Sequence, residues 1–248
     1  MTQAQQSPRS SSSTRPGSRG PVSILLAAVL GLVFATILSW LFGTTVEIVG
    51  MTFFWREQGV RHSEQLAIDG IAHIAGHPRC AMAADTVQVA HNVAGAVLTP
   101  FVWIGAVTFI QKYSAPVDTA SMSIIASKLQ SFLHTLARWV LMSIYVAQDI
   151  AVRLVVMWFA LPLFGMLFLL AIIDGLVRRD LRKWSGGRES SFVYHHAKKL
   201  TTWGLTGGFA IYLAWPFGGI NPVAIVTALS LFSAAALTIT VASFKKYL

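Results

Sequence analysis

The stretch LVVMWFALPLFGMLFLLAII, residues 154–173, decides the fold because it runs for twenty residues without a charge. An α-helix of about 20 apolar residues is long enough to cross the hydrocarbon core of a bilayer. Three further apolar segments, at 22–42, 200–217 and 222–243, have comparable length and carry no charge. The sequence therefore predicts an all-α, polytopic membrane protein with about four transmembrane helices, the second of them kinked at Pro162.

The overall composition supports this class. The chain of 248 residues is 54% hydrophobic and only 12% charged, and its mean hydropathy is +0.61. A soluble domain carries about 25% charged residues. The net charge of +9 suggests nucleic acid as a partner, but the basic residues lie beside apolar runs, as membrane orientation requires. A single cysteine, Cys80, excludes an internal disulfide.

The long segment 43–153 is predicted to be a helical periplasmic region. It carries seven basic and seven acidic residues, so it is neutral. Its helices are expected to break near Gly59 and again at Gly76 and Pro78. Residues 92–110 are just long enough to span. A crossing there would move the later basic loop to the outer side, so a partly buried or re-entrant helix is favoured.

The charge distribution predicts the orientation. The tail 1–21, expected to be disordered, has three arginines and no acid, and the C-terminal end 244–248 has two lysines. The basic elbow, residues 174–199, has seven basic residues. Four crossings place all three on one side, which the positive-inside rule makes cytoplasmic. The predicted location is the bacterial inner membrane, with both termini in the cytoplasm.

The elbow is also the candidate binding surface. Gly186 and Gly187 are expected to end one helix, and Ser190 or Ser191 to cap the next. Its cations suit anionic headgroups or an acidic protein partner, and no direct nucleic-acid binding is expected. The predicted docking residues are Arg178, Arg179, Arg182, Lys183, Arg188, Glu189, Ser190, Ser191, His195, His196, Lys198 and Lys199.

Metal binding is considered and not favoured. His73, His77 and Cys80 are weak candidates, because the His-x₃-His spacing suits zinc on a helix. Pro78 disfavours helix at His77. His195 and His196 are consecutive and so point about 100° apart on a helix, away from a shared metal.

Other histidines and motifs offer no chemistry. His62 and His91 are interpreted as lone surface or packing histidines. The chain has no phosphate-binding loop, zinc-protease motif or nucleophile elbow, and no ionisable residue lies within the four predicted spans. We therefore predict no cofactor and no enzymatic activity, and a transporter is disfavoured because transported ions or protons usually need such a residue.

Small residues predict helix packing. Gly31 lies on a small face of the first span, Gly204 and Gly208 form a G-x-x-x-G face, and Ala234 belongs to a small face of the last span. Such faces let helix backbones approach closely in lipid. They could serve contacts within the chain or a homo-oligomer.

The stretch DGLVRRDLRKWSGGRESSFVYHHAKK, residues 174–199, resembles the signature of a family of inner-membrane proteins encoded in integrating conjugative elements. The wider layout is similar over most of residues 22–245, including an Ala-Leu-Pro kink at 160–162. The family is a domain of unknown function found beside the conjugative coupling ATPase. The resemblance implies an accessory of conjugative DNA transfer through a type IV secretion system, with no catalytic residue to carry over.

Three functions follow from these observations. The first is a non-enzymatic conjugation component whose elbow docks the coupling ATPase or another conjugation protein. The second is a metal- or lipid-handling membrane protein. The third is an envelope sensor that uses the 43–153 region.

Overall fold

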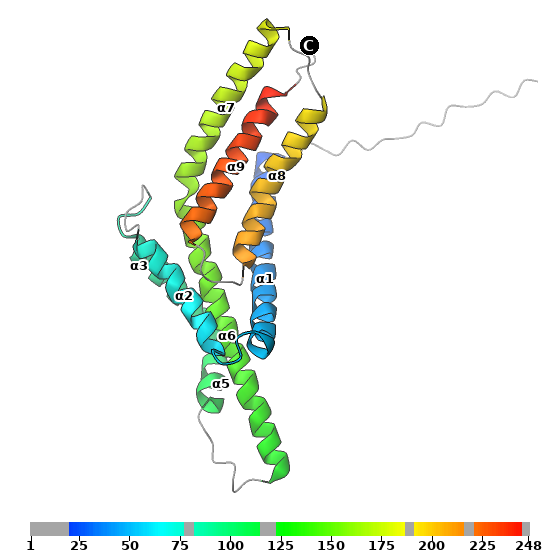
Figure 1. Ribbon diagram of the computed structural model, residues 1–248. Helices are drawn as coiled ribbons and strands as arrows, with labels where there is room; N and C mark the ends of the chain where they lie inside the picture. The colour runs from blue at the N-terminus through cyan, green and yellow to red at the C-terminus, as the bar shows by residue number, and fades with distance from the viewer. Residues whose placement is uncertain (1–19, 77–81, 115–122, 187–190, 216–220, 245–248) are drawn as a thin grey trace, which may run out of the picture. The chain divides into compact units, whose positions relative to one another are not determined.

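The computed structural model describes residues 20–76, 82–114, 123–186, 191–215 and 221–244, and the long elements among them are helices (Figure 1). The all-α prediction is confirmed. The helices are α1 (Pro21–Phe53), α2 (Val60–Ala75), α3 (Thr86–Ala96), α4 (Leu98–Trp103), α5 (Ala106–Tyr113), α6 (Ile124–Phe159), α7 (Leu161–Trp184), α8 (Ser191–Ala214) and α9 (Pro222–Ala242).

The chain divides into two compact units, residues 1–35 and 36–248. The first unit is described from residue 20 onward and consists of the first part of α1. The second unit contains the rest of α1 and all the other helices. The contacts described below all lie within this second unit.

Local capping explains where several helices begin. Asp85 accepts a hydrogen bond from the Gln88 amide at the start of α3, and Ser123 accepts one from the Ala126 amide at the start of α6. Asn221 caps α9 and Pro222 is its first residue, as the sequence predicts. These side chains satisfy backbone amides that have no partner within the helix.

Four helices among the described residues are long and apolar enough to cross a membrane: α1 from Leu25, α6, α7 and α9. Residues Thr86–Trp103, which contain α3 and α4, and residues Ala106–Tyr113, which form α5, make a further apolar pair of segments with an 80° bend between them. Such a pair is a broken span or a re-entrant loop. Much of α7 is apolar and yet exposed, including Met166, Leu169 and Leu170. Apolar faces of this extent are covered by lipid or by protein, so the chain is a multi-pass membrane protein.

Helices α6 and α7 meet at a break rather than forming one kinked rod. Helix α6 ends at Phe159 and α7 starts at Leu161, so the helix is interrupted at Ala160, two residues before the predicted kink at Pro162. The amide of Ala160 still bonds to Val156 and Met157. Pro162 has no amide hydrogen to continue the ladder, which explains why the helix stops here. In Figure 1, α7 leads onward from the end of α6 and does not fold back along it.

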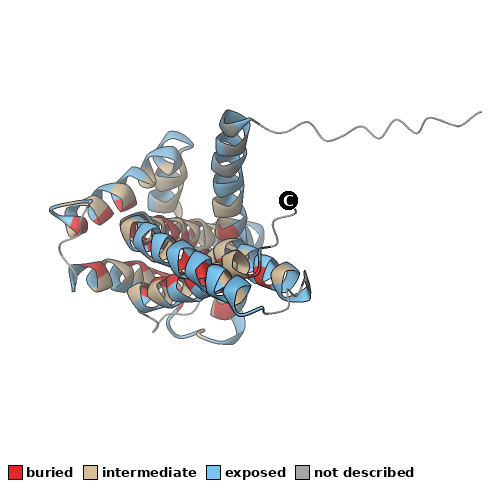
Figure 2. Cartoon of the chain, turned by 90° about the horizontal axis from the view of Figure 1, so that it is seen from above, coloured by how far each residue is buried: buried red, intermediate tan, exposed pale blue. Residues whose placement is uncertain are grey.

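The core lies where α2, α3, α6, α7, α8 and α9 meet. Helices α7 and α8 both pack extensively against α9, and α2 packs against α6. Buried residues from different helices form one apolar cluster, among them Ile74, Val152, Phe164, Tyr212 and Val226. Figure 2 shows that buried residues lie mainly on helix faces turned toward other helices, whereas outward faces are exposed.

Candidate functional site

The elbow begins with a glycine cap. Helix α7 ends at Trp184, and Gly186 follows with a φ of +68°. This left-handed conformation costs an L-residue free energy that glycine avoids. Gly187, Arg188, Glu189 and Ser190 lie outside the described residues, and α8 begins at Ser191.

Contacts with the end of α9 hold the elbow in place. The Arg182 guanidinium donates a hydrogen bond to the carbonyl of Ala242, the last residue of α9. The ring of Tyr194, in the first turn of α8, meets the ring of Phe244 edge-on at 5.9 Å between centroids. A cation at a helix C-terminus also interacts favourably with the helix dipole. The ends of α7 and α9 and the start of α8 therefore lie together, and Arg182 has a structural partner.

The other cations of the elbow are held less firmly. Arg178 pairs with Asp174 at 2.9 Å and Lys183 with Asp180 at 3.8 Å, and all four side chains are about half exposed or more. Surface pairs of this kind contribute about 0–1 kcal/mol. The remaining cations, Arg179, Lys198 and Lys199, make no ion pair with another described residue. Most of the positive charge thus stays available to a partner.

The two elbow histidines do not converge. His196 donates from Nδ1 to the Phe192 carbonyl at 2.9 Å, and its ring packs at a tilt against the Phe192 ring, with centroids 3.9 Å apart. His195 meets the ring of Tyr194 instead, at 5.5 Å. Their different neighbours follow from their position side by side on one helix.

The weak metal candidates are only partly described. His73 donates from Nδ1 to the backbone carbonyl of Asp69 at 2.6 Å, while His77 and Cys80 lie outside the described residues. Within the described parts of the chain, no three His, Cys, Asp or Glu side chains are grouped closely enough to hold a metal ion.

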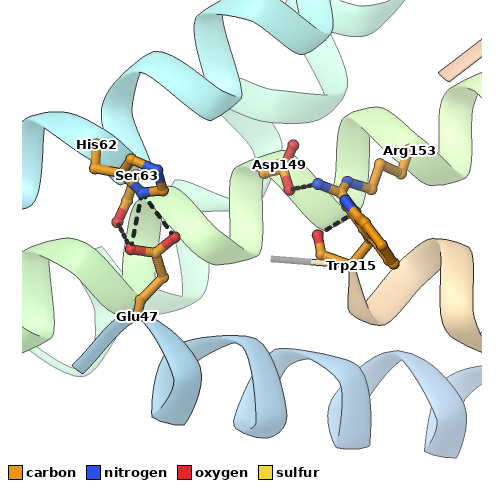
Figure 3. Close-up of polar contacts among 6 residues, drawn as sticks. All are labelled: Glu47, His62, Ser63, Asp149, Arg153 and Trp215. Carbon is orange, nitrogen blue, oxygen red and sulfur yellow. Dashed lines mark hydrogen bonds and ion pairs between the residues drawn. The ribbon is translucent and has the colours of Figure 1, made fainter. Parts of the chain in front are cut away.

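A polar cluster that the sequence analysis missed lies inside the second unit (Figure 3). Glu47 of α1 is 1% exposed and accepts hydrogen bonds from the Ser63 hydroxyl at 3.0 Å and from His62 Nδ1 at 3.1 Å. The His62 ring also stacks on Trp55, with centroids 4.3 Å apart. His62 is therefore a packing histidine, as one of the two alternatives predicted, but it is not a lone one because it also contacts Glu47. His91 is exposed.

The second half of the polar cluster is an ion pair on α6. Arg153 and Asp149 are 2.8 Å apart, and their side chains are only 11% and 12% exposed. Arg153 also donates to the carbonyls of Tyr212 and Trp215, at 2.8 and 2.6 Å, where α8 ends. The guanidinium thus caps the C-terminus of α8 while Asp149 balances its charge.

The prediction that no ionisable residue lies within the four predicted spans still holds, because 154–173 begins directly after Arg153. Helix α6, however, is a candidate span that extends beyond the predicted one, and it does contain this ion pair. The i, i+4 spacing of Asp149 and Arg153 is equally typical of a solvated helix surface. Their carbonyl partners lie about sixty positions further along the chain. No local pattern therefore distinguished the buried pair from an exposed one.

The two halves of the polar cluster share a small cavity. Glu47, Ser63 and Asp149 line it together with apolar residues such as Val146 and Leu213. Its volume of about 20 Å³ is room for about one water molecule. Each carboxylate has its own hydrogen-bond donors, so the polar cluster ties α1, α2, α6 and the end of α8 together through hydrogen bonds and one ion pair.

The glycines predicted to pack lie in different surroundings. A methyl group on Gly204 would come within 2.8 Å of Ser233 Oγ, and one on Gly208 within 2.6 Å of a Leu229 methyl, so both glycines lie against α9. Ala234 of α9 is buried. Gly31 belongs to the first unit, where a methyl group would meet nothing within 4 Å. Its packing role stays a prediction.

The helices and the elbow define a multi-pass membrane protein with a basic surface at one end of the α7–α9 bundle. The chain belongs to the family described as IncC plasmid conjugative DNA transfer protein DtrJ-like, whose model matches residues 54–245. The expected class, a membrane protein of conjugative DNA transfer, is thereby confirmed. No curated protein and no solved structure matches the chain.

Proposed function

We propose that this protein is a non-enzymatic inner-membrane accessory of conjugative DNA transfer that docks a partner through its basic elbow. The observation that carries the proposal is that Arg182 and Tyr194 fix the elbow to the end of α9, within a chain of a conjugative transfer family. A cationic surface beside helix ends that side-chain contacts hold together is suited to binding another protein rather than to catalysis.

The proposed topology follows from the gathering of charge. The ends of the elbow lie beside the end of α9. The elbow carries an excess of lysine and arginine, and two lysines follow α9 in the sequence. The positive-inside rule places this end in the cytoplasm. At 1.5 Å per residue, α6 and α7 together measure about 90 Å, whereas a bilayer core is about 30 Å thick. A single crossing by this pair would leave much of its length outside the hydrocarbon core, with both chain termini cytoplasmic.

The partner we propose is acidic. The coupling ATPase is the first choice, with another conjugation protein as the alternative, and the proposed genetic context is an integrating conjugative element. Arg179, Lys198 and Lys199 supply charge that is not engaged within the described residues. Exposed Trp184 and Phe192, 91% and 70% accessible, add apolar area beside these cations. Aromatic side chains flanked by basic ones are typical of interface centres.

Charge reversal at the two lysines tests the proposal. The Lys198→Glu, Lys199→Glu variant is expected to lower both partner retention in mild detergent and DNA transfer by about tenfold, since two interfacial charges contribute about 1.4 kcal/mol or more. Arg182 is left intact because it binds the end of α9.

The matched control is Lys112→Glu, Lys128→Glu, which reverses two exposed lysines on α5 and α6, away from the elbow. This variant should keep normal transfer and partner retention. If reversal at 198 and 199 leaves both quantities at the level of this control while the protein inserts normally, the elbow is not the docking surface.

A further inference from the structure

Two apolar grooves run between α1, the α3–α5 segment and α6. The first groove, of about 420 Å³, is lined by Thr36 and Ile37 of α1, Pro100 of α4 and Ala147 and Leu154 of α6, among others. The second groove, of about 560 Å³, is lined by residues that include Thr44, Ile48, Phe109, Leu136 and Ser143. Each volume falls in the range of about 300–1,000 Å³ that is usual for ligand pockets.

The grooves follow one another along the same two helices. Trp40, Phe101 and Ile104 line both of them. The Trp40 indole donates to the Ser143 carbonyl at 3.0 Å, and its ring meets Phe101 edge-on at 6.1 Å, so this shared wall is fixed. From Thr36 to Ile48, α1 rises about 18 Å at 1.5 Å per residue. We call the two grooves together the trough.

The backbone explains why the trough stays open. Helix α4 ends at Trp103, and Gly105 with a φ of +76° turns the chain by 80° into α5. Because of this bend, α4 and α5 do not continue as one straight helix. Helix α1 approaches α6 closely at Gly43, where a methyl group would lie 3.0 Å from Val146. The bend at Gly105 and the close approach at Gly43 thus set the course of the backbones that line the trough.

The walls indicate what fills the trough. No lining residue is charged, and the side chains are chiefly aliphatic or aromatic. The walls come from α1 and α6, which are both candidate membrane spans. Water is unfavourable in an apolar space of this kind. The hydrocarbon chains of the surrounding bilayer are the apolar molecules that could occupy it. The trough is about as long as residues 36–48 of α1. This extended shape suits a long hydrocarbon chain better than a compact ligand.

One polar atom adds a second feature. The Thr44 hydroxyl oxygen is buried and has no hydrogen-bond partner within the described residues. Thr44 lines the second groove. A buried hydroxyl without a partner is costly, so an acceptor such as an ester carbonyl would stabilise it.

From these observations we infer that the trough binds an acyl chain of a phospholipid from the surrounding bilayer. The ester group would lie near Thr44, and the hydrocarbon would pass along Trp40 and Phe101. This site is separate from the elbow and does not depend on the proposed docking function.

Filling the trough tests the inference. The Ala147→Phe, Ser143→Phe variant places a ring in each groove and keeps the Ser143 carbonyl that binds Trp40. Native mass spectrometry of the detergent-washed full chain should show about one retained phospholipid per wild-type chain and at least fivefold lower occupancy in the variant. The control Ala210→Phe adds one ring at an exposed alanine of α8 and should retain the wild-type lipid.

A second measurement does not depend on the variant folding. Wild-type protein reconstituted with a phospholipid that carries a diazirine in its acyl chain should be labelled within residues 36–48 or 136–154. Labelling only elsewhere, or equal lipid retention in the filled and control variants, would overturn the inference. So would a dimer mass that the filling mutations abolish, because a second copy would then occupy the trough. Free fatty acid in place of phospholipid in the mass spectrum would overturn the assignment to a bilayer lipid.

Discussion

Removing Arg153 should destabilise the protein far more than removing a chemically identical pair elsewhere. In Arg153→Met, the 2.8 Å contact with Asp149 is lost, and so are the hydrogen bonds to the carbonyls of Tyr212 and Trp215. Breaking a buried ion pair by removing one partner costs about 3–5 kcal/mol, because the remaining charge is left without compensation. For a chain of this length, that corresponds to a fall in Tm of roughly 6–20 °C.

Two further variants, Asp149→Leu and the double variant at 149 and 153, measure how strongly the two residues stabilise each other. Asp149→Leu should destabilise by a similar amount, because it leaves the guanidinium buried with only neutral carbonyl partners. The double variant should be less destabilised than the sum of the single variants, by about 1–3 kcal/mol. Thermal unfolding in mild detergent, followed by tryptophan fluorescence, measures all three.

The chain provides its own control for this prediction. Arg178 and Asp174 form the same i, i+4 pair at 2.9 Å, but their side chains are 65% and 49% exposed. Arg178→Met is expected to change the stability by about 1 kcal/mol or less. Equal Tm values for Arg153→Met and Arg178→Met, or strictly additive effects at 149 and 153, would refute the assignment of a buried, coupled pair.

Three smaller changes test other contacts by the same unfolding assay. Gly175→Ala should destabilise the protein by about 1–3 kcal/mol, because its methyl group would lie 2.9 Å from the Thr238 carbonyl of α9. Gly165→Ala is the control: it lies in open space on the same helix, so its effect on stability should be neutral or favourable. Glu47→Ala should cost about 2–4 kcal/mol by leaving two donors without an acceptor. Gly186→Ala should cost about 1 kcal/mol because of its positive φ.

Each of these predictions has a clear contrary result. A Gly175→Ala protein as stable as Gly165→Ala would mean that α7 and α9 are further apart than described. If Glu47→Ala matches Glu57→Ala, a change at an exposed position, then Glu47 is not buried. An unchanged Tm for Gly186→Ala would show that the α7 cap does not need a left-handed residue.

The sequence predicted the parts of the fold that depend on local pattern. Asn221 and Pro222 marked the start of α9, and Gly186 marked the end of α7, because capping chemistry involves only neighbouring residues. The break at Ala160 was placed close to Pro162 but was expected to be only a kink. Whether a proline bends or ends a helix depends on what packs around it, and the local sequence does not contain that information.

The polar cluster shows what the sequence could not reveal. Glu47 is separated from Ser63 by sixteen positions, and Arg153 from Trp215 by sixty-two. Burial of these groups depends on how α1, α2, α6 and α8 come together. A carboxylate in a neutral, amphipathic segment has the same local pattern whether it faces water or a cavity. A glutamate ahead of a histidine and a serine on the next helix was the available signal, and it is not specific.

Cysteine accessibility tests the central claim, that the elbow lies at the cytoplasmic face, most directly. On a Cys80→Ser background, Lys199→Cys and Lys128→Cys each place one thiol at an exposed position, on α8 and on α6. In spheroplasts, a membrane-impermeant maleimide should label the cysteine at 128 and leave the one at 199 unlabelled until the membrane is opened. Labelling of position 199 from outside, with 128 protected, would contradict the account.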